Sequence, residues 1–215
     1  MKHTKLLKVV ATSLAVVTAS CGSAYAAAIT GSSANINIIS APASVQTGNL
    51  EQDGFFNVFE EQTTVVTNLG VNASTVGDSF PPAPVATTIS GSVTSFFVHY
   101  DSDLDPATLT GFLEFDGPIL GISWGAGLLD SSDSILGAVG TTYSPAGSAR
   151  GYESGNDSVV FTSLNRVDFE SLANNGIDSL RVLVAADIEV SEPSILAVFG
   201  LGLLGLGFAR RKQPV

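Results

Sequence analysis

The feature that most constrains the fold is a regular alternation of side chains over residues 180–190. Every second residue there is apolar: Leu180, Val182, Val184, Ala186, Ile188 and Val190. The intervening positions are mixed and include Arg181, Asp187 and Glu189. Because successive side chains of a β-strand point to opposite faces, this period of two predicts a strand with one buried apolar face and one face open to solvent.

Short runs rich in Val, Ile, Thr and Phe occupy the rest of the region between residues 27 and 190, and turn-forming residues interrupt them. The predicted strands are residues 35–39, 55–59, 63–67, 86–90, 93–100, 109–115, 119–124, 159–164 and 180–190. Residues 93–100 are apolar on both faces, which is typical of a central strand. Residues 128–137 are compatible with a short helix that ends at Gly137. The pattern predicts an all-β fold, a single jelly-roll-like β-sandwich over residues 27–190.

The N-terminus has the pattern of a secretory signal peptide. Three lysines precede an apolar run over residues 9–19, and an A-x-A sequence follows at Ala24 and Ala26. We therefore predict a signal peptide over residues 1–26 that is cleaved after Ala26. A second interpretation is a loose lipobox, in which Cys21 would become a lipidated N-terminus.

The C-terminus has a polar tripeptide, an uncharged span and a basic stop. The tripeptide is Ser191, Glu192 and Pro193, the span covers residues 195–209, and the basic stop is Arg210, Arg211 and Lys212. As a helix the span would be about 22 Å long at 1.5 Å per residue, shorter than the roughly 30 Å core of a bilayer. It also contains four glycines, which weaken a helix. We predict a short transmembrane helix that anchors the chain temporarily, with the basic stop on the cytoplasmic side.

This order of elements over residues 191–215 resembles the C-terminal sorting signal of bacterial PEP-CTERM proteins, which are substrates of exosortases. Ser191 stands where that family has its first Pro, so the sequence here is Ser-Glu-Pro. Three further segments resemble parts of PEP-CTERM ectodomains: residues 95–101, 115–121 and 175–182. The resemblance implies export across the inner membrane of a Gram-negative-type bacterium, transient membrane anchoring, and processing by an exosortase. The product would stay at the cell surface or be extracellular.

The composition of residues 27–190 is strongly acidic. This region has 19 acidic residues against three arginines and no lysine, which gives a net charge of −16. Nucleic acid is excluded as a partner, because binding phosphates requires clustered Lys and Arg. The only cysteine is Cys21, so the region has no disulfide, no thiol nucleophile and no cysteine-ligated metal.

One acidic segment is a candidate metal site. Asp101, Asp103 and Asp105 place carboxylates at alternate positions, a spacing that can surround a calcium ion with oxygen ligands. The segment is not an EF-hand, because Pro106 and Phe112 occupy the positions where that loop has Gly and Glu. A calcium site in a sandwich loop and a solvated acidic turn are the two interpretations.

Two other groups have side chains that could take part in catalysis. Glu114 and Asp116 lie two apart on a predicted strand, about 6–7 Å apart on one face. Such a pair resembles part of a jelly-roll glycosidase motif, but Ile119 stands where that motif has another Glu. His99 is the only histidine left after removal of the signal peptide, and we predict a hydrogen-bonded structural role for it. No catalytic residues are therefore predicted.

The expected function is that of a non-enzymatic cell-surface or extracellular-matrix protein associated with exopolysaccharide. Its processing partners would be signal peptidase and an exosortase, and its helix would contact the inner membrane. The alternative is a carbohydrate-binding or carbohydrate-degrading β-sandwich, with or without a dependence on calcium. Trp124, Tyr143 and Tyr152 would form a sugar-stacking platform in that case, although single aromatic residues more often belong to a core.

Overall fold

Two five-stranded sheets make up most of the fold. The computed structural model describes residues 24–81, 86–103, 107–145, 150–173 and 176–188. The first sheet, called the β7 sheet, has the order β2-β7-β10-β9-β5 and consists of Ile29–Ser32, Ala107–Phe115, Arg166–Ala173, Ser158–Ser163 and Ser79–Phe80. The second, called the β6 sheet, has the order β3-β4-β6-β11-β8 and consists of Ile36–Ile38, Phe56–Val71, Thr87–Asp101, Ile177–Ala185 and Ile119–Ser123. The all-β prediction is confirmed.

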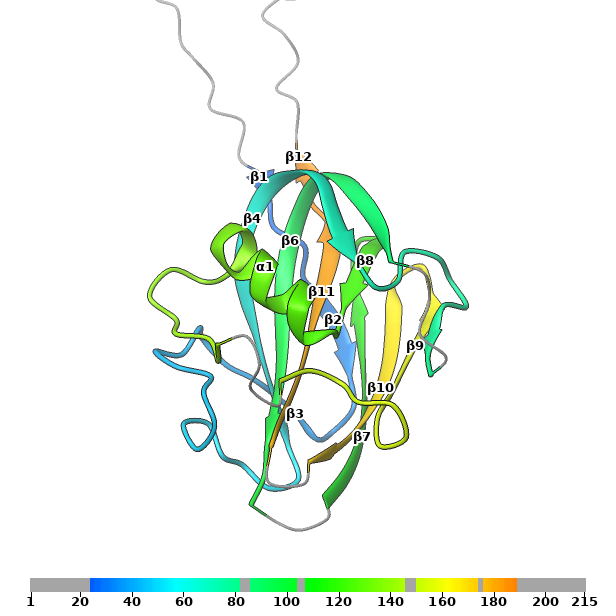
Figure 1. Cartoon of the computed structure of the whole chain (residues 1–215). Coiled ribbons are helices and arrows are strands. Elements are labelled where there is room, and N and C mark those ends of the chain that lie inside the picture. Colours follow the sequence, from blue (N-terminus) through cyan, green and yellow to red (C-terminus); the bar gives the residue numbers. More distant parts are fainter. Residues whose placement is uncertain (1–23, 82–85, 104–106, 146–149, 174–175, 189–215) are drawn as a thin grey trace, which may run out of the picture. The chain divides into compact units, whose positions relative to one another are not determined.

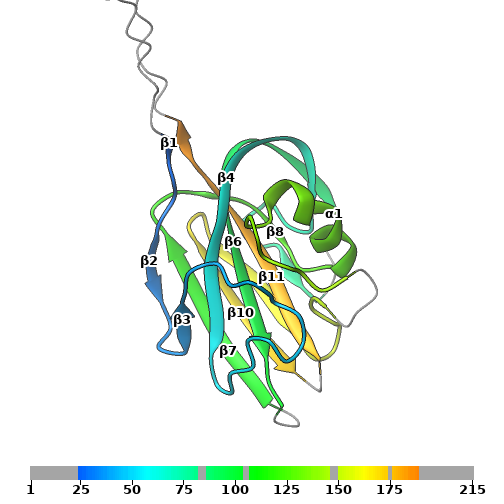
Figure 2. The same cartoon turned by 90° about the vertical axis from the view of Figure 1, so that its left-hand side faces the viewer.

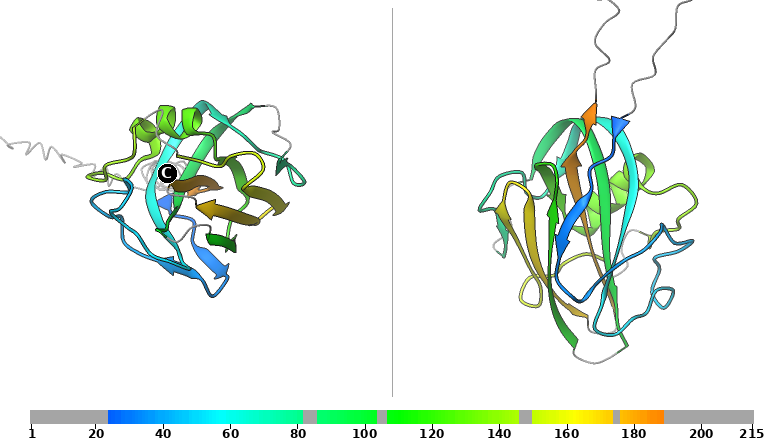
Figure 3. Two further views of the ribbon diagram at one scale, coloured as in Figure 1. Left: turned by 60° about the horizontal axis from the view of Figure 1, so that its bottom comes forward. Right: turned by 180° about the vertical axis from the view of Figure 1, so that it is seen from behind.

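The two sheets share an apolar core between their facing sides. Phe96 and Val98 of β6 lie in the same buried cluster as Leu113 and Phe115 of β7. The Phe96 and Phe115 rings pack with their centroids 5.0 Å apart. The two sheets lie in separate layers in Figure 2, and the view from behind in Figure 3 shows β2, β7 and β10 side by side.

Two pairs of predicted strands are continuous in the structure. The segments 55–59 and 63–67 belong to the single strand β4, whose register shifts between Glu60 and Thr63. The segments 86–90 and 93–100 likewise form β6, which continues through Gly91 at a φ of 138°. The interruptions in the apolar pattern thus mark irregularities within long strands and not turns. β6 lies between β4 and β11, as expected of a strand that is apolar on both faces.

A single helix in the described residues, α1 (Ala126–Leu136), covers the face of the β6 sheet that points away from the β7 sheet (Figure 1). This confirms the helix predicted over residues 128–137, and the N–H of Gly137 donates to the carbonyl of Asp133 at its end.

Because α1 covers this face of the β6 sheet, the alternation over residues 180–190 does not separate a buried face from an exposed one. Arg181, expected on an open face, is fully buried, because α1 and its flanking loops pack over that side of β11. The prediction of a solvent-exposed second face was therefore wrong over β11.

The ends of the folded region pair with each other. β1 (Ala24–Tyr25) is antiparallel to β12 (Asp187–Ile188), and β1 lies just before the predicted cleavage point after Ala26. Among the residues that the structure describes, no helix is long and apolar enough to cross a membrane. The predicted transmembrane helix 195–209, the tripeptide and the basic stop all lie outside the described residues, as does the signal peptide up to residue 23.

Candidate functional site

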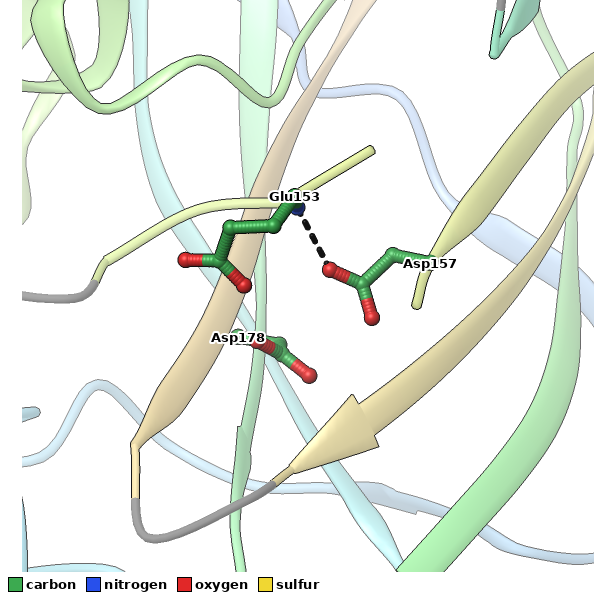
Figure 4. Close-up of side chains that lie close together, drawn as sticks. All are labelled: Glu153, Asp157 and Asp178. Atoms are coloured by element: carbon green, nitrogen blue, oxygen red, sulfur yellow. Dashed lines mark hydrogen bonds between the residues drawn. The ribbon is translucent and has the colours of Figure 1, made fainter. Parts of the chain in front are cut away.

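Three carboxylates from two distant parts of the chain come together near the start of β11. Glu153, Asp157 and Asp178 each offer an oxygen atom, and these atoms all lie within 4.8 Å of one another (Figure 4). Asp178 belongs to β11, whereas Glu153 and Asp157 lie in the loop that leads into β9. We call these three residues the acidic cluster.

Asp157 is held in place by backbone hydrogen bonds to both carboxylate oxygens. The N–H of Glu153 donates to Oδ2 at 2.6 Å, and the N–H of Leu172 in β10 donates to Oδ1 at 2.8 Å. The same loop is fixed at Tyr152, whose N–H donates to the carbonyl of Trp124 and whose hydroxyl accepts from Ser171. The position of the Asp157 carboxylate is therefore set by the backbone before any ligand arrives.

Asp178 is almost as deeply buried as Asp157, but in the described residues no backbone N–H donates a hydrogen bond to it. Only 4% of the residue is exposed, and its Oδ2 has no hydrogen-bond partner among the described residues. Its side chain points to the inner side of the β6 sheet, and Tyr100 of β6 is its partner in register. Burial, together with the charges of Asp157 and Glu153, raises the pKa of Asp178 to about 8.

The arginines of the described fold form their ion pairs away from the acidic cluster. Arg150 binds Asp133 at 2.7 Å and Arg181 binds Glu61 at 2.6 Å, both on the helix-covered side of the β6 sheet. Arg166 binds Glu114 and Asp168 on the β7 sheet. None of the ion pairs in the described residues reaches the acidic cluster, so its three carboxylates have no protein counter-charge.

A second candidate site is a groove on the outer face of the β7 sheet. Its volume is about 290 Å³, and its lining includes Phe112 and Thr110 of β7 and Asp168 and Glu170 of β10. The Arg166 guanidinium lies over the Phe112 ring, 3.8 Å from its centroid. An aromatic face with carboxylates beside it is a combination that can hold a polar, ring-shaped ligand such as a sugar.

The calcium site expected from Asp101, Asp103 and Asp105 is described only in part. Asp101 ends β6, is buried, and accepts a hydrogen bond from the N–H of Gly48 at 2.6 Å. Asp103 is exposed and Asp105 lies outside the described residues. The site stays a prediction.

The structure gives Glu114 and Asp116 separate partners. Glu114 pairs with Arg166, and the Oδ1 of Asp116 accepts from the N–H of Ala28 at 2.8 Å. His99 has the buried structural position predicted for it, with its Nδ1 3.3 Å from the Ser179 hydroxyl.

The three aromatic residues considered as a platform do not form one. Trp124 and Tyr152 are buried in the core between the sheets. Tyr143 lies on the other side of the β6 sheet, packs against Phe97 and donates its hydroxyl hydrogen bond to Glu61. The core interpretation of these residues was the right one.

The comparison with protein families concerns the C-terminus. The model of the PEP-CTERM protein-sorting motif matches residues 189–212, which include Ser191, Glu192, Pro193 and the basic stop. No curated protein and no solved structure matches the chain. The chain thus carries the PEP-CTERM sorting motif that its sequence resembles, which marks an exported protein that an exosortase-type system processes and sorts to the cell surface.

Proposed function

We propose that this chain is a non-enzymatic protein of the cell surface or extracellular matrix, whose β-sandwich works outside the cell in association with exopolysaccharide. The observation that carries the proposal is the sorting motif at residues 189–212. The signal peptide 1–26 starts export, and the helix over residues 195–209 holds the chain in the inner membrane until an exosortase acts at Ser191-Glu192-Pro193.

The position of the motif supports processing that leaves the fold intact. β12 ends at Ile188, and the matched motif begins at the next residue. β11 is anchored well before that point, by pairing with β6 along its whole length. Cleavage near Ser191 would therefore remove no strand of either five-stranded sheet.

The strand connections support the jelly-roll-like part of the proposal. β6 pairs with β11 in one sheet, and β7 pairs with β10 in the other. The chain therefore changes sheets between β6 and β7, returns to the β6 sheet for β8, crosses back for β9 and β10, and changes again between β10 and β11. Paired crossings of this kind are how a jelly roll wraps an antiparallel ribbon into two layers.

The side chains with catalytic potential support a non-enzymatic role. Glu114 and Asp116 each bind a separate partner, so they do not form the free acid and base pair that glycoside hydrolysis requires. His99 and Ser179 contact each other but are both buried. Because both side chains are buried, the folded domain gives a substrate no access to them.

The sorting part of the proposal is tested by fractionating producing cells that express Glu192→Ala and Pro193→Ala variants of the full chain. We expect the variants to accumulate uncut in the inner membrane, whereas the original chain reaches the surface or the medium. Glu60→Ala is a matched control on the exposed surface of β4 and should be sorted normally. Normal surface delivery of both motif variants would contradict the proposal.

A second candidate function is carbohydrate binding, and the groove on the β7 sheet favours it. We propose Phe112 as the stacking surface and Asp168 and Glu170 as hydrogen-bond acceptors for hydroxyl groups. Glycan-array binding that is lost in Phe112→Ala but kept in Phe55→Ala, an exposed phenylalanine outside the groove, would support it. If hydrolysis is detected and Glu114→Gln leaves it unchanged, catalysis by the Glu114 and Asp116 pair is excluded.

A further inference from the structure

Asp178 is a buried carboxyl group that the described fold does not fully compensate with hydrogen bonds or an ion pair. A carboxylate taken out of water normally gains hydrogen bonds or an ion pair in return, because an uncompensated buried charge is costly. Asp178 is 4% exposed, its Oδ2 has no partner in the described part of the chain, and two further carboxylates face it.

The sequence limits what could neutralise this negative charge. Between residues 27 and 190 the only cationic side chains besides His99 are three arginines. All three form ion pairs with carboxylates outside the acidic cluster, and His99 points to the opposite side of the β6 sheet from Asp178. Residues 27–190 therefore hold no further cationic side chain for the cluster, and a bound cation is the remaining source of positive charge there.

The geometry matches a calcium ion. Calcium binds oxygen ligands at roughly 2.3–2.6 Å, so two ligands on opposite sides of the ion are up to about 5 Å apart. The oxygen atoms of the acidic cluster lie within 4.8 Å of one another, which fits this coordination sphere. Magnesium binds at roughly 2.0–2.1 Å and needs a tighter set.

We propose that Glu153, Asp157 and Asp178 form a calcium site. Each carboxylate supplies at least one oxygen, and water completes the shell. Asp157 is oriented by the N–H groups of Glu153 and Leu172, which leaves lone pairs on both of its oxygens for the ion. Asp178 provides the buried charge, and Glu153, which is exposed, closes the site from the solvent side.

The bound ion would join three separate parts of the sandwich. Asp178 lies on β11, and Asp157 is attached to β10 through Leu172. Glu153 belongs to the loop that begins at Arg150, which forms a bridge with Ile177 of β11. Calcium would tie this loop to both sheets, so the ion's main effect should be on the stability of the exported domain.

The test is calcium titration of the mature protein recovered from producing cells and treated with a chelator. Calorimetry should detect one site of the strength typical of extracellular modules, with a Kd of roughly 10⁻⁴–10⁻³ M, and calcium should raise the Tm relative to the chelated protein. Magnesium should bind at least tenfold more weakly. Glu153→Gln, at an exposed position that tolerates the change, should weaken calcium binding at least tenfold.

The Asp178→Asn variant distinguishes a metal site from a buried carboxyl group that is protonated and binds no ion. Without calcium this variant should melt at or above the Tm of the original protein, because it removes a buried acidic group that has no counter-charge in the described fold, and calcium should no longer raise its Tm. Asp103→Asn is the matched control at the other acidic segment and should keep the full response. The proposal is overturned if millimolar calcium neither binds nor raises the Tm, if Asp178→Asn keeps the response, or if Asp103→Asn loses it. A magnesium response equal to that of calcium would overturn the assignment of the ion.

Discussion

Arg181 of β11 and Glu61 of β4 form a fully buried, two-pronged ion pair beneath α1. Nε and Nη2 of Arg181 donate to the two carboxylate oxygens of Glu61, each at 2.6 Å. Both side chains are 0% exposed. The same guanidinium donates to the carbonyl of Leu129 and to Ser132 on the inner side of α1. The pair therefore fastens the helix to the sheet.

Replacing Arg181 with Met should destabilise the fold severely. The change leaves Glu61 buried without its cation, and breaking one side of a buried pair typically costs about 3–5 kcal/mol. Denaturant unfolding of the exported domain, followed by tryptophan fluorescence, measures this loss. Arg166→Met is the matched control, because Arg166 is part of a partly exposed ion pair on the β7 sheet, and it should shift the unfolding midpoint far less.

The double variant Arg181→Met with Glu61→Leu tests whether unpaired charge is the cause. It should recover a large part of the stability lost by Arg181→Met alone, since neither charge then remains buried. Equal stability of Arg181→Met and Arg166→Met would contradict the structural role of the pair.

His99 should make the fold sensitive to mild acid. Burial and the nearby charge of Arg150 lower its pKa from 6.5 to about 4 in the folded protein. As the pH falls, the unfolded chain takes up the proton first. The stability contributed by neutral His99 is thus fully present above about pH 6.5 and is lost as the pH falls to about 4, by up to about 3 kcal/mol.

Comparing His99→Gln with the original protein isolates this effect. The variant cannot be protonated at that position, so its unfolding midpoint should fall less between pH 7 and pH 4.5. Parallel pH profiles for the two proteins would show that His99 does not titrate in this way.

Gly151 should not tolerate a side chain. Its φ is 105°, and an added Cβ would lie 2.3 Å from the carbonyl oxygen of Trp124, which is backbone and has little room to move. Gly151→Ala should cost about 3 kcal/mol or more, from left-handed strain plus overpacking. Gly155 has a similar φ of 99° but open space around it, so Gly155→Ala should cost only about 1 kcal/mol. Thermal or denaturant unfolding distinguishes them, and equal losses would argue against the close contact.

Most of the strand pattern was readable from the sequence because it depends on local alternation. β10 is the main strand that was missed, although Val167 and Phe169 alternate there with Arg166, Asp168 and Glu170. Its apolar positions are few, and its charged residues resemble those of a loop. In the structure they lie on the outer face of the β7 sheet, where Arg166 and Asp168 pair with each other.

The burial of Arg181 and the acidic cluster both depend on tertiary contacts, which leave no local pattern in the sequence. Arg181 looks like a surface residue in a period-two pattern, and only the packing of α1 over β11 makes it buried. Glu153 and Asp157 have an ordinary turn composition, and nothing local connects them to Asp178. The sorting signal, by contrast, is a linear feature of the sequence, and the family comparison matches it at residues 189–212.

The most direct test of the central claim is the intact mass of the protein recovered from producing cells, measured separately for the surface and medium fractions. We predict a mass that lacks both ends, with cleavage after Ala26 and near Ser191. A mass that retains residues 195–215 would mean that the tail is a permanent anchor, and would contradict sorting by an exosortase.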